Sequence, residues 1–203
     1  MSTSFPKDWC QFIIKNNTLL EGGIVEPIQE VVFTAINARL EKRFKALGGW
    51  KGKYELVTGE TDETAFCPVH WPEDKAGKYR ACYKLGEIAL INNTYWLSSA
   101  LGVNDVKLCF IFWVHGGLGG KSLGEVGRKL LSVSTTAAMR DAGVVRDLDD
   151  GTIYLPFVFD AAVLAAEYPN VDKTLAPLDA AVDTLLKVHP QFDAAVRELS
   201  EKK

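Results

Sequence analysis

The chain has 203 residues, of which 47% are hydrophobic and 24% charged, as in an ordinary globular protein with enough chain to bury a core. Its net charge is −3, with 12 basic and 12 acidic side chains in residues 1–100 and 11 and 14 in residues 101–203. This balance disfavours nucleic acid as a partner, because no general positive field would attract a polyanion.

The first residues carry neither a basic segment nor an apolar run typical of a secretory signal, and no apolar stretch is long enough to span a bilayer. We therefore expect a cytoplasmic protein without a membrane partner. The cysteines are widely spaced and expected to be reduced: Cys10, Cys67, Cys82 and Cys109. Cys67 and His70 form only a single close pair of metal-binding residues, which is a weak zinc signal. We expect no metal site and no cofactor.

In the first half of the chain, apolar residues recur at helical spacing and then alternate as in strands. The helical spacing predicts a helix over residues 9–15, capped by Asp8, and a long helix over 24–47, stopped by Gly48 and Gly49. The alternating pattern predicts three strands over residues 54–58, 65–71 and 79–85. Along the third strand, Arg80, Cys82 and Lys84 are expected to face solvent.

The second half begins with residues 88–102, whose pattern fits either a strand or a short helix. Residues 107–115 predict a strand that is covered on both faces, because both sets of alternate residues are apolar. A helix over 122–143 and a strand over 152–159 follow. Three short helices then close the chain, and their expected start signals are Asp160 or its neighbour, Asn170 and Pro190.

This order of elements predicts an α+β fold. We expect a mostly antiparallel or mixed sheet, a meander of three to five strands, flanked by two long helices and followed by a C-terminal helical segment. Residues 1–203 are expected to form one domain, with a helix and loop in residues 1–22 and the helices of residues 160–203 packed on it.

A glycine-rich loop joins the strand ending at His115 to the helix beginning at Ser122. It resembles the phosphate-binding loop of nucleotide-binding proteins, whose backbone N–H groups surround a phosphate while a lysine neutralises it. Here His115 occupies the position of the first glycine, and Ser122 with Glu125 forms a capping box that explains both residues by helix initiation. The candidate binding residues of the loop are Gly117, Gly119, Gly120, Lys121 and Ser122.

The succession of a helix, three strands, a helix and a strand resembles the core of PD-(D/E)XK nucleases. That resemblance implies a metal-dependent site, for which Asp62, Glu73 and Lys75 are the nearest candidates, with Glu26 or Glu30 as the helical acid. Glu73, however, follows a proline in a turn, and a turn does not give the rigid carboxylate placement that metal chemistry needs.

Aromatic residues gather in the region of the predicted sheet, and half-exposed aromatics on a sheet are typical contacts for a protein partner or a stacked base. The candidates there are Trp71, Tyr79, Arg80 and Tyr83. We expect a non-catalytic macromolecule-binding or regulatory domain, with a protein partner favoured, that binds through this surface or the helix over 24–47. No catalytic residue is assigned. The alternative is a phosphate-handling enzyme, either a nucleotide binder or a metal-dependent nuclease.

Overall fold

The computed structural model describes residues 7–16, 22–56, 63–88, 96–102, 106–114, 133–146 and 152–201. Its helices are α1 (Lys7–Lys15), α2 (Gly22–Leu47), α3 (Trp96–Ala100), α5 (Val133–Asp141), α6 (Ala161–Glu167) and α7 (Ala176–Glu201). Its strands are β1 (Trp50–Tyr54), β2 (Thr64–Pro68), β3 (Ala81–Ile88), β4 (Lys107–Val114), β5 (Val145–Arg146) and β6 (Ile153–Phe157). The predicted helix over 122–143 is described only in its last part, and the glycine-rich loop lies outside the described residues.

The strands form one six-stranded sheet in the order β1-β2-β3-β4-β6-β5, and every pairing is antiparallel. The α+β fold with an antiparallel sheet is therefore confirmed, but the sheet has six strands where three to five were expected. The short strand β5 follows Gly143, whose φ of 85° ends the preceding helix, and pairs with the edge of β6. Two residues are too few to give a recognisable alternation.

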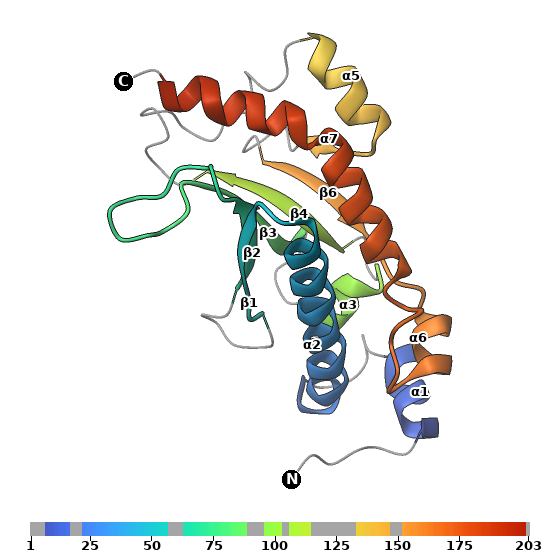
Figure 1. Ribbon diagram of the computed structural model, residues 1–203. Helices are drawn as coiled ribbons and strands as arrows, with labels where there is room; N and C mark the ends of the chain where they lie inside the picture. Colours follow the sequence, from blue (N-terminus) through green and yellow to red (C-terminus); the bar gives the residue numbers. More distant parts are fainter. Residues whose placement is uncertain are drawn as a thin grey trace.

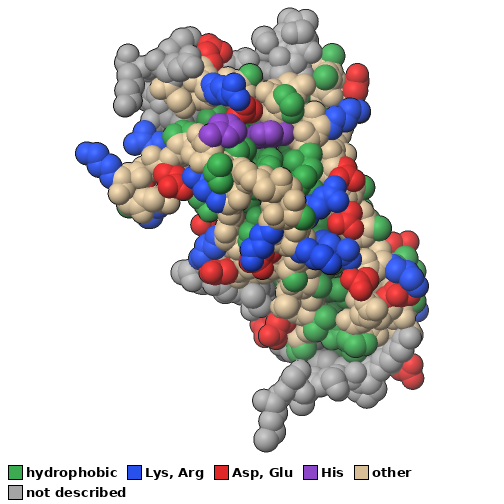
Figure 2. All heavy atoms as spheres, viewed as in Figure 1, with side chains coloured by type: hydrophobic (Ala, Val, Ile, Leu, Met, Phe, Trp, Pro, Cys, Tyr) green, Lys and Arg blue, Asp and Glu red, His purple; other side chains and the backbone are tan. Residues whose placement is uncertain are grey.

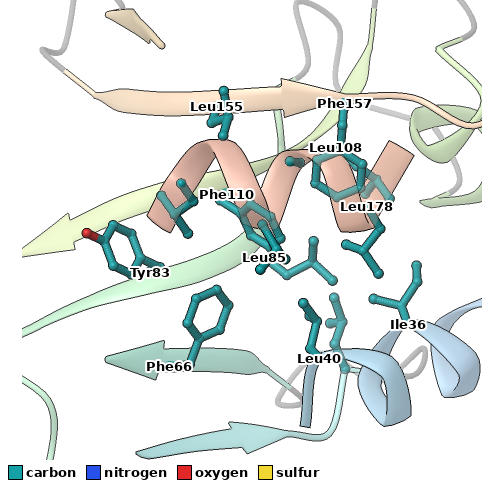
Figure 3. Close-up of a cluster of buried hydrophobic side chains, with 14 of the residues drawn as sticks. Ile36, Leu40, Phe66, Tyr83, Leu85, Leu108, Phe110, Leu155, Phe157 and Leu178 are labelled. Carbon is teal, nitrogen blue, oxygen red and sulfur yellow. The ribbon is translucent and has the colours of Figure 1, made fainter. Parts of the chain in front are cut away.

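One face of the sheet is covered by α2 and α7, and the main core lies between them and the strands (Figure 1). Figure 3 shows Ile36 and Leu40 of α2 together with Leu178 of α7 pointing toward side chains of the strands. The labelled strand residues in this cluster are Phe66, Tyr83, Leu85, Leu108, Phe110, Leu155 and Phe157. Burial of these apolar surfaces is the main contribution to stability, because each large side chain gives about 1.5–3 kcal/mol.

The opposite face of the sheet is covered unevenly. On β4, Cys109 is fully buried but Trp113 is 40% exposed, so the expected cover on both faces is only partly present. On β3, Cys82 is buried rather than solvent-facing, and Lys84 pairs with Glu63 and lies over the Trp113 ring. The expectation that Arg80, Cys82 and Lys84 form a solvent-facing row is therefore wrong at Cys82.

The C-terminal segment contains two helices where three were expected. Asp160 caps α6 as predicted, since its carboxylate accepts from the N–H groups of Ala162 and Val163. Pro190, however, lies inside the long helix α7 and does not begin a new one. A proline in a helix interior removes one backbone hydrogen bond and bends the helix. Figure 1 accordingly shows α7 as two arms that meet at a bend.

The helix α7 continues through Pro190 because its apolar face is buried on both sides of the proline. Leu185 and Val188 before the proline and Phe192 and Val196 after it are all buried. Packing of these side chains therefore offsets the local cost of the proline, about 3 kcal/mol in a helix interior. The sequence signal of a helix start was outweighed by tertiary contacts.

Basic side chains near the end of α2 are partly neutralised by acidic residues near and on α7. Arg39 forms an ion pair with Asp172 at 2.9 Å, and Arg43 pairs with Asp183. These surface pairs link α2 to α7 and to the segment that precedes it, although exposed ion pairs contribute only about 0–1 kcal/mol each. They also reduce the positive charge that a polyanion would meet.

The core predicts a strong dependence of stability on Phe110, which is 1% exposed and contacts the rings of Phe66 and Phe157. Replacing it with alanine leaves a cavity between sheet and helices, so Phe110→Ala is expected to lower the free energy of unfolding by about 3–5 kcal/mol. Urea denaturation measures this change. The matched control is Phe12→Ala, because Phe12 is 55% exposed and its removal should change stability by less than about 0.5 kcal/mol. Equal losses for the two variants would contradict the placement of the core.

Candidate functional site

The predicted aromatic candidates occupy two different environments. Trp71 and Tyr83 are 2% and 0% exposed, so the expectation that they stand half exposed on a surface is wrong. Their rings pack on each other at 5.3 Å between centroids, within the core aromatics. Tyr79 and Arg80 are partly exposed at the end of the connection between β2 and β3. The loop candidates Gly117 to Ser122 lie outside the described residues, so their role stays a prediction.

The nuclease candidates are not brought together into a metal site in the described part of the chain. Glu73 forms an ion pair with Lys51 at 2.6 Å, and Lys75 lies on an exposed turn. Asp62 is outside the described residues. Within those ranges, no group of three histidine, cysteine, aspartate or glutamate side chains is arranged to hold a metal ion.

A groove runs between α2 and β1. It is lined by Thr34, Asn37, Ala38, Glu41, Tyr54 and Glu55. Its polar base is well fixed, because Asn37 accepts a hydrogen bond from Thr64 and donates one to the backbone carbonyl of Leu56. β1 is the first strand in the sheet order, so in the described sheet it pairs only with β2, and its last residue, Tyr54, lines the groove.

A second site is built around Asp193 of α7, where the sheet, the helix and the connection between β2 and β3 meet. One oxygen of its carboxylate accepts from His70 Nε2 at 2.6 Å and from Trp71 Nε1 at 2.8 Å. The other lies 2.6 Å from the guanidinium of Arg197. The carboxylate thus has three donors, one of them a half-exposed histidine.

His189 lies one helical turn before Asp193 and is held by Tyr83. The Tyr83 hydroxyl and His189 Nδ1 are 2.9 Å apart, and the imidazole ring packs on the rings of Trp50 and Trp71 at 4.9 and 5.5 Å. Figure 2 shows two histidine side chains side by side on one face of the molecule, and His70 and His189 are the histidines among the described residues. The site therefore presents two imidazoles on a base of aromatic rings.

The environment fixes the protonation of the acidic and basic groups. Burial raises the pKa of Asp193, but hydrogen bonds from His70 and Trp71 and the charge of Arg197 outweigh burial, so the pKa is lowered overall. Burial lowers the pKa of His189, and the carboxylate of Asp193 opposes that shift without cancelling it. Burial also raises the pKa of Tyr83 well above its usual value. At neutral pH the set is an ionised Asp193, a neutral His189 and a protonated Tyr83.

These states determine which ring nitrogens carry protons. An ionised carboxylate can only accept, so Nε2 of His70 carries the proton and Nδ1 is the nitrogen that solvent can reach. A buried hydroxyl without an acceptor costs about 1–3 kcal/mol, and His189 Nδ1 is the acceptor that the described residues offer to Tyr83. The Tyr83 hydroxyl therefore donates to Nδ1, and His189 keeps its proton on Nε2.

Sequence patterns did not identify this second site. His70 and Asp193 are 123 residues apart, and no local spacing links them. Pro190 also suggested a helix start, which would have placed His189 at a helix terminus instead of on the core-facing side of a long helix. The available signal was the spacing of His189, Asp193 and Arg197, which are four residues apart and so share one helix face.

No protein-family model, curated protein or solved structure matches this chain. The candidate sites are therefore defined by the geometry and chemistry of the chain alone.

The lowered pKa of His189 predicts a loss of stability in mild acid. The folded state favours the neutral imidazole, so the contribution of His189 to the free energy of unfolding is complete above the ordinary histidine pKa of 6.5. As the pH falls below that value, the unfolded chain takes up the proton first and the free energy of unfolding decreases. Urea denaturation at pH 7.5 and 5.5 is expected to show this decrease in the wild type.

The control for this prediction is His189→Gln, whose amide can still accept from Tyr83 but does not titrate. The decrease between pH 7.5 and 5.5 should be smaller in this variant. An equal decrease in both proteins would show that His189 does not cause it.

Proposed function

We propose that this chain is a macromolecule-binding domain that takes an extended segment of a protein partner into the groove between α2 and β1. The observation that carries the proposal is that the groove lies beside Tyr54, the last residue of an edge strand. An edge strand presents backbone N–H and C=O groups that an extended peptide can pair with, while neighbouring pockets receive its side chains.

The groove also indicates the chemistry of the segment. Two carboxylates line it. Glu41 forms an ion pair with Lys45, and Glu55 forms one with Lys53. A lysine or arginine of the partner can compete for these exposed carboxylates at little cost, because exposed ion pairs are weak. We therefore propose a segment in extended conformation that carries a basic side chain.

The net charge and the Arg39 and Arg43 ion pairs support a protein partner over nucleic acid. Among the described helices, none is long and apolar enough to cross a membrane. We further propose a cytoplasmic location, since the four cysteines are buried and form no disulfide. Burial raises the pKa of Cys82 to about 12, which keeps that thiol protonated and unreactive. The phosphate-handling alternative rests either on residues 116–122, which lie outside the described part of the chain, or on the nuclease candidates Asp62, Glu73 and Lys75. The described members of the second set form no metal site.

Filling the groove is expected to abolish peptide binding. Ala38 is an exposed groove residue on α2, so Ala38→Arg places a long side chain across the peptide path without disturbing the core. Peptides selected from a random library on the wild type should bind Ala38→Arg at least about tenfold more weakly, a change of about 1.4 kcal/mol measured by fluorescence polarisation.

Ala46→Arg is the matched control, because Ala46 is an exposed alanine of the same helix that does not line the groove. This variant should bind the selected peptides as the wild type does. If the peptides bind all three proteins equally, the groove is not the recognition site. Selected peptides that lack Lys and Arg would contradict the proposed role of Glu41 and Glu55.

A further inference from the structure

We propose that His70, Asp193 and His189 form an acid–base site that hydrolyses carboxylic esters, with His70 as the general base and His189 as the donor to the carbonyl oxygen. This activity goes beyond peptide binding and uses a different part of the molecule. It follows from the two hydrogen-bonded pairs that fix the imidazoles and from their exposure on one face.

His70 has the arrangement of a positioned base. Its Nε2–H donates to Asp193 at 2.6 Å, which leaves Nδ1 to accept a proton, and its side chain is 51% exposed, so water can reach that nitrogen. The carboxylate orients the ring and stabilises the imidazolium that forms when Nδ1 takes the proton. Asp193 is itself fixed by Trp71 and Arg197, so it cannot turn away from the histidine.

His189 supplies a neutral donor. Tyr83 donates to its Nδ1, so Nε2–H is the group that a carbonyl oxygen can accept from. The burial that keeps Tyr83 protonated also prevents it from passing its proton to His189. The His189 ring therefore stays neutral and stabilises negative charge on oxygen by donating a hydrogen bond. A neutral imidazole held in this way can polarise a carbonyl group.

A carbonyl substrate fits these groups better than a phosphodiester. The developing oxyanion of an ester carries one negative charge, which a single N–H donor can stabilise. Phosphoryl transfer spreads charge over several oxygens and is usually stabilised by several cations. Arg197, the cation that contacts this site, is already paired with Asp193. Beside His70, Val69 is 55% exposed, so an apolar substituent would be favoured.

The reaction balances with water as the only co-reactant. His70 Nδ1 takes a proton from water as the water oxygen forms a bond to the carbonyl carbon, and His189 Nε2–H donates to the resulting oxyanion. The bond from carbon to the alcohol oxygen then breaks, and the alcohol oxygen takes the proton back from His70. The products are a carboxylic acid and an alcohol, and both histidines return to their starting states.

The test uses p-nitrophenyl acetate as the probe and the full chain as the enzyme, with rates measured from pH 5 to 8.5. The wild type is expected to exceed free imidazole at equal concentration by about 10²-fold, as a positioned base does. His70→Gln and His189→Gln should each remove this excess, and Asp193→Asn should reduce it. Asp183→Asn is the matched control, since Asp183 is an exposed aspartate of the same helix, and it should keep the wild-type rate.

A second measurement needs no variant and so does not depend on whether each substitution folds. General-base attack by water makes the wild-type rate fall in D₂O, whereas direct attack by an imidazole nitrogen does not. A wild-type rate no higher than that of free imidazole would overturn the proposal, as would full activity in His70→Gln or an unchanged rate in D₂O. Hydrolysis of bis(p-nitrophenyl) phosphate that depends on His70, without ester hydrolysis, would overturn the assignment to carboxylic esters.

Discussion

The carboxylate of Asp193 is the interaction on which the site depends. It lies on the arm of α7 beyond Pro190, and it accepts from His70 and Trp71 of the connection between β2 and β3. A charged group in a largely buried position is tolerated only when donors replace the water it has lost. Here the donors come from a segment distant in sequence, so the same hydrogen bonds that solvate Asp193 also fix that connection against the helix.

Strand β1 links the two candidate sites. Its first residue, Trp50, packs on the His189 ring, and its last, Tyr54, lines the groove beside α2. Both side chains belong to one five-residue strand that is paired along its length with β2, so a change in that pairing would affect both candidate sites. Binding of an extended segment at the edge of β1 would therefore stabilise the strand that supports His189, which gives the two proposals a physical connection.

Local patterns predicted those elements whose signals are local. The helix α2 stops at Gly48 and Gly49, both with positive φ, and Asp160 caps α6, because these effects act within a few residues of the chain. They could not predict that α7 continues through Pro190, because that outcome depends on packing of Phe192 and Val196 against the sheet. The Asp193 site could not be predicted from the sequence for the same reason, since its partners come together only in the folded chain.

Asp193 and Tyr83 hold both imidazoles with the proton on Nε2. The most direct measurement is a ¹⁵N–¹H spectrum of the histidine rings at pH 8.5, compared between the wild type, Asp193→Asn and Tyr83→Phe. We expect the Nε2–H tautomer for His70 and His189 in the wild type. We also expect Tyr83→Phe to mix the tautomers of His189 while leaving His70 unchanged, and Asp193→Asn to perturb the signals of His70. An Nδ1–H tautomer for either ring in the wild type would show that these two contacts do not fix the imidazoles in this way.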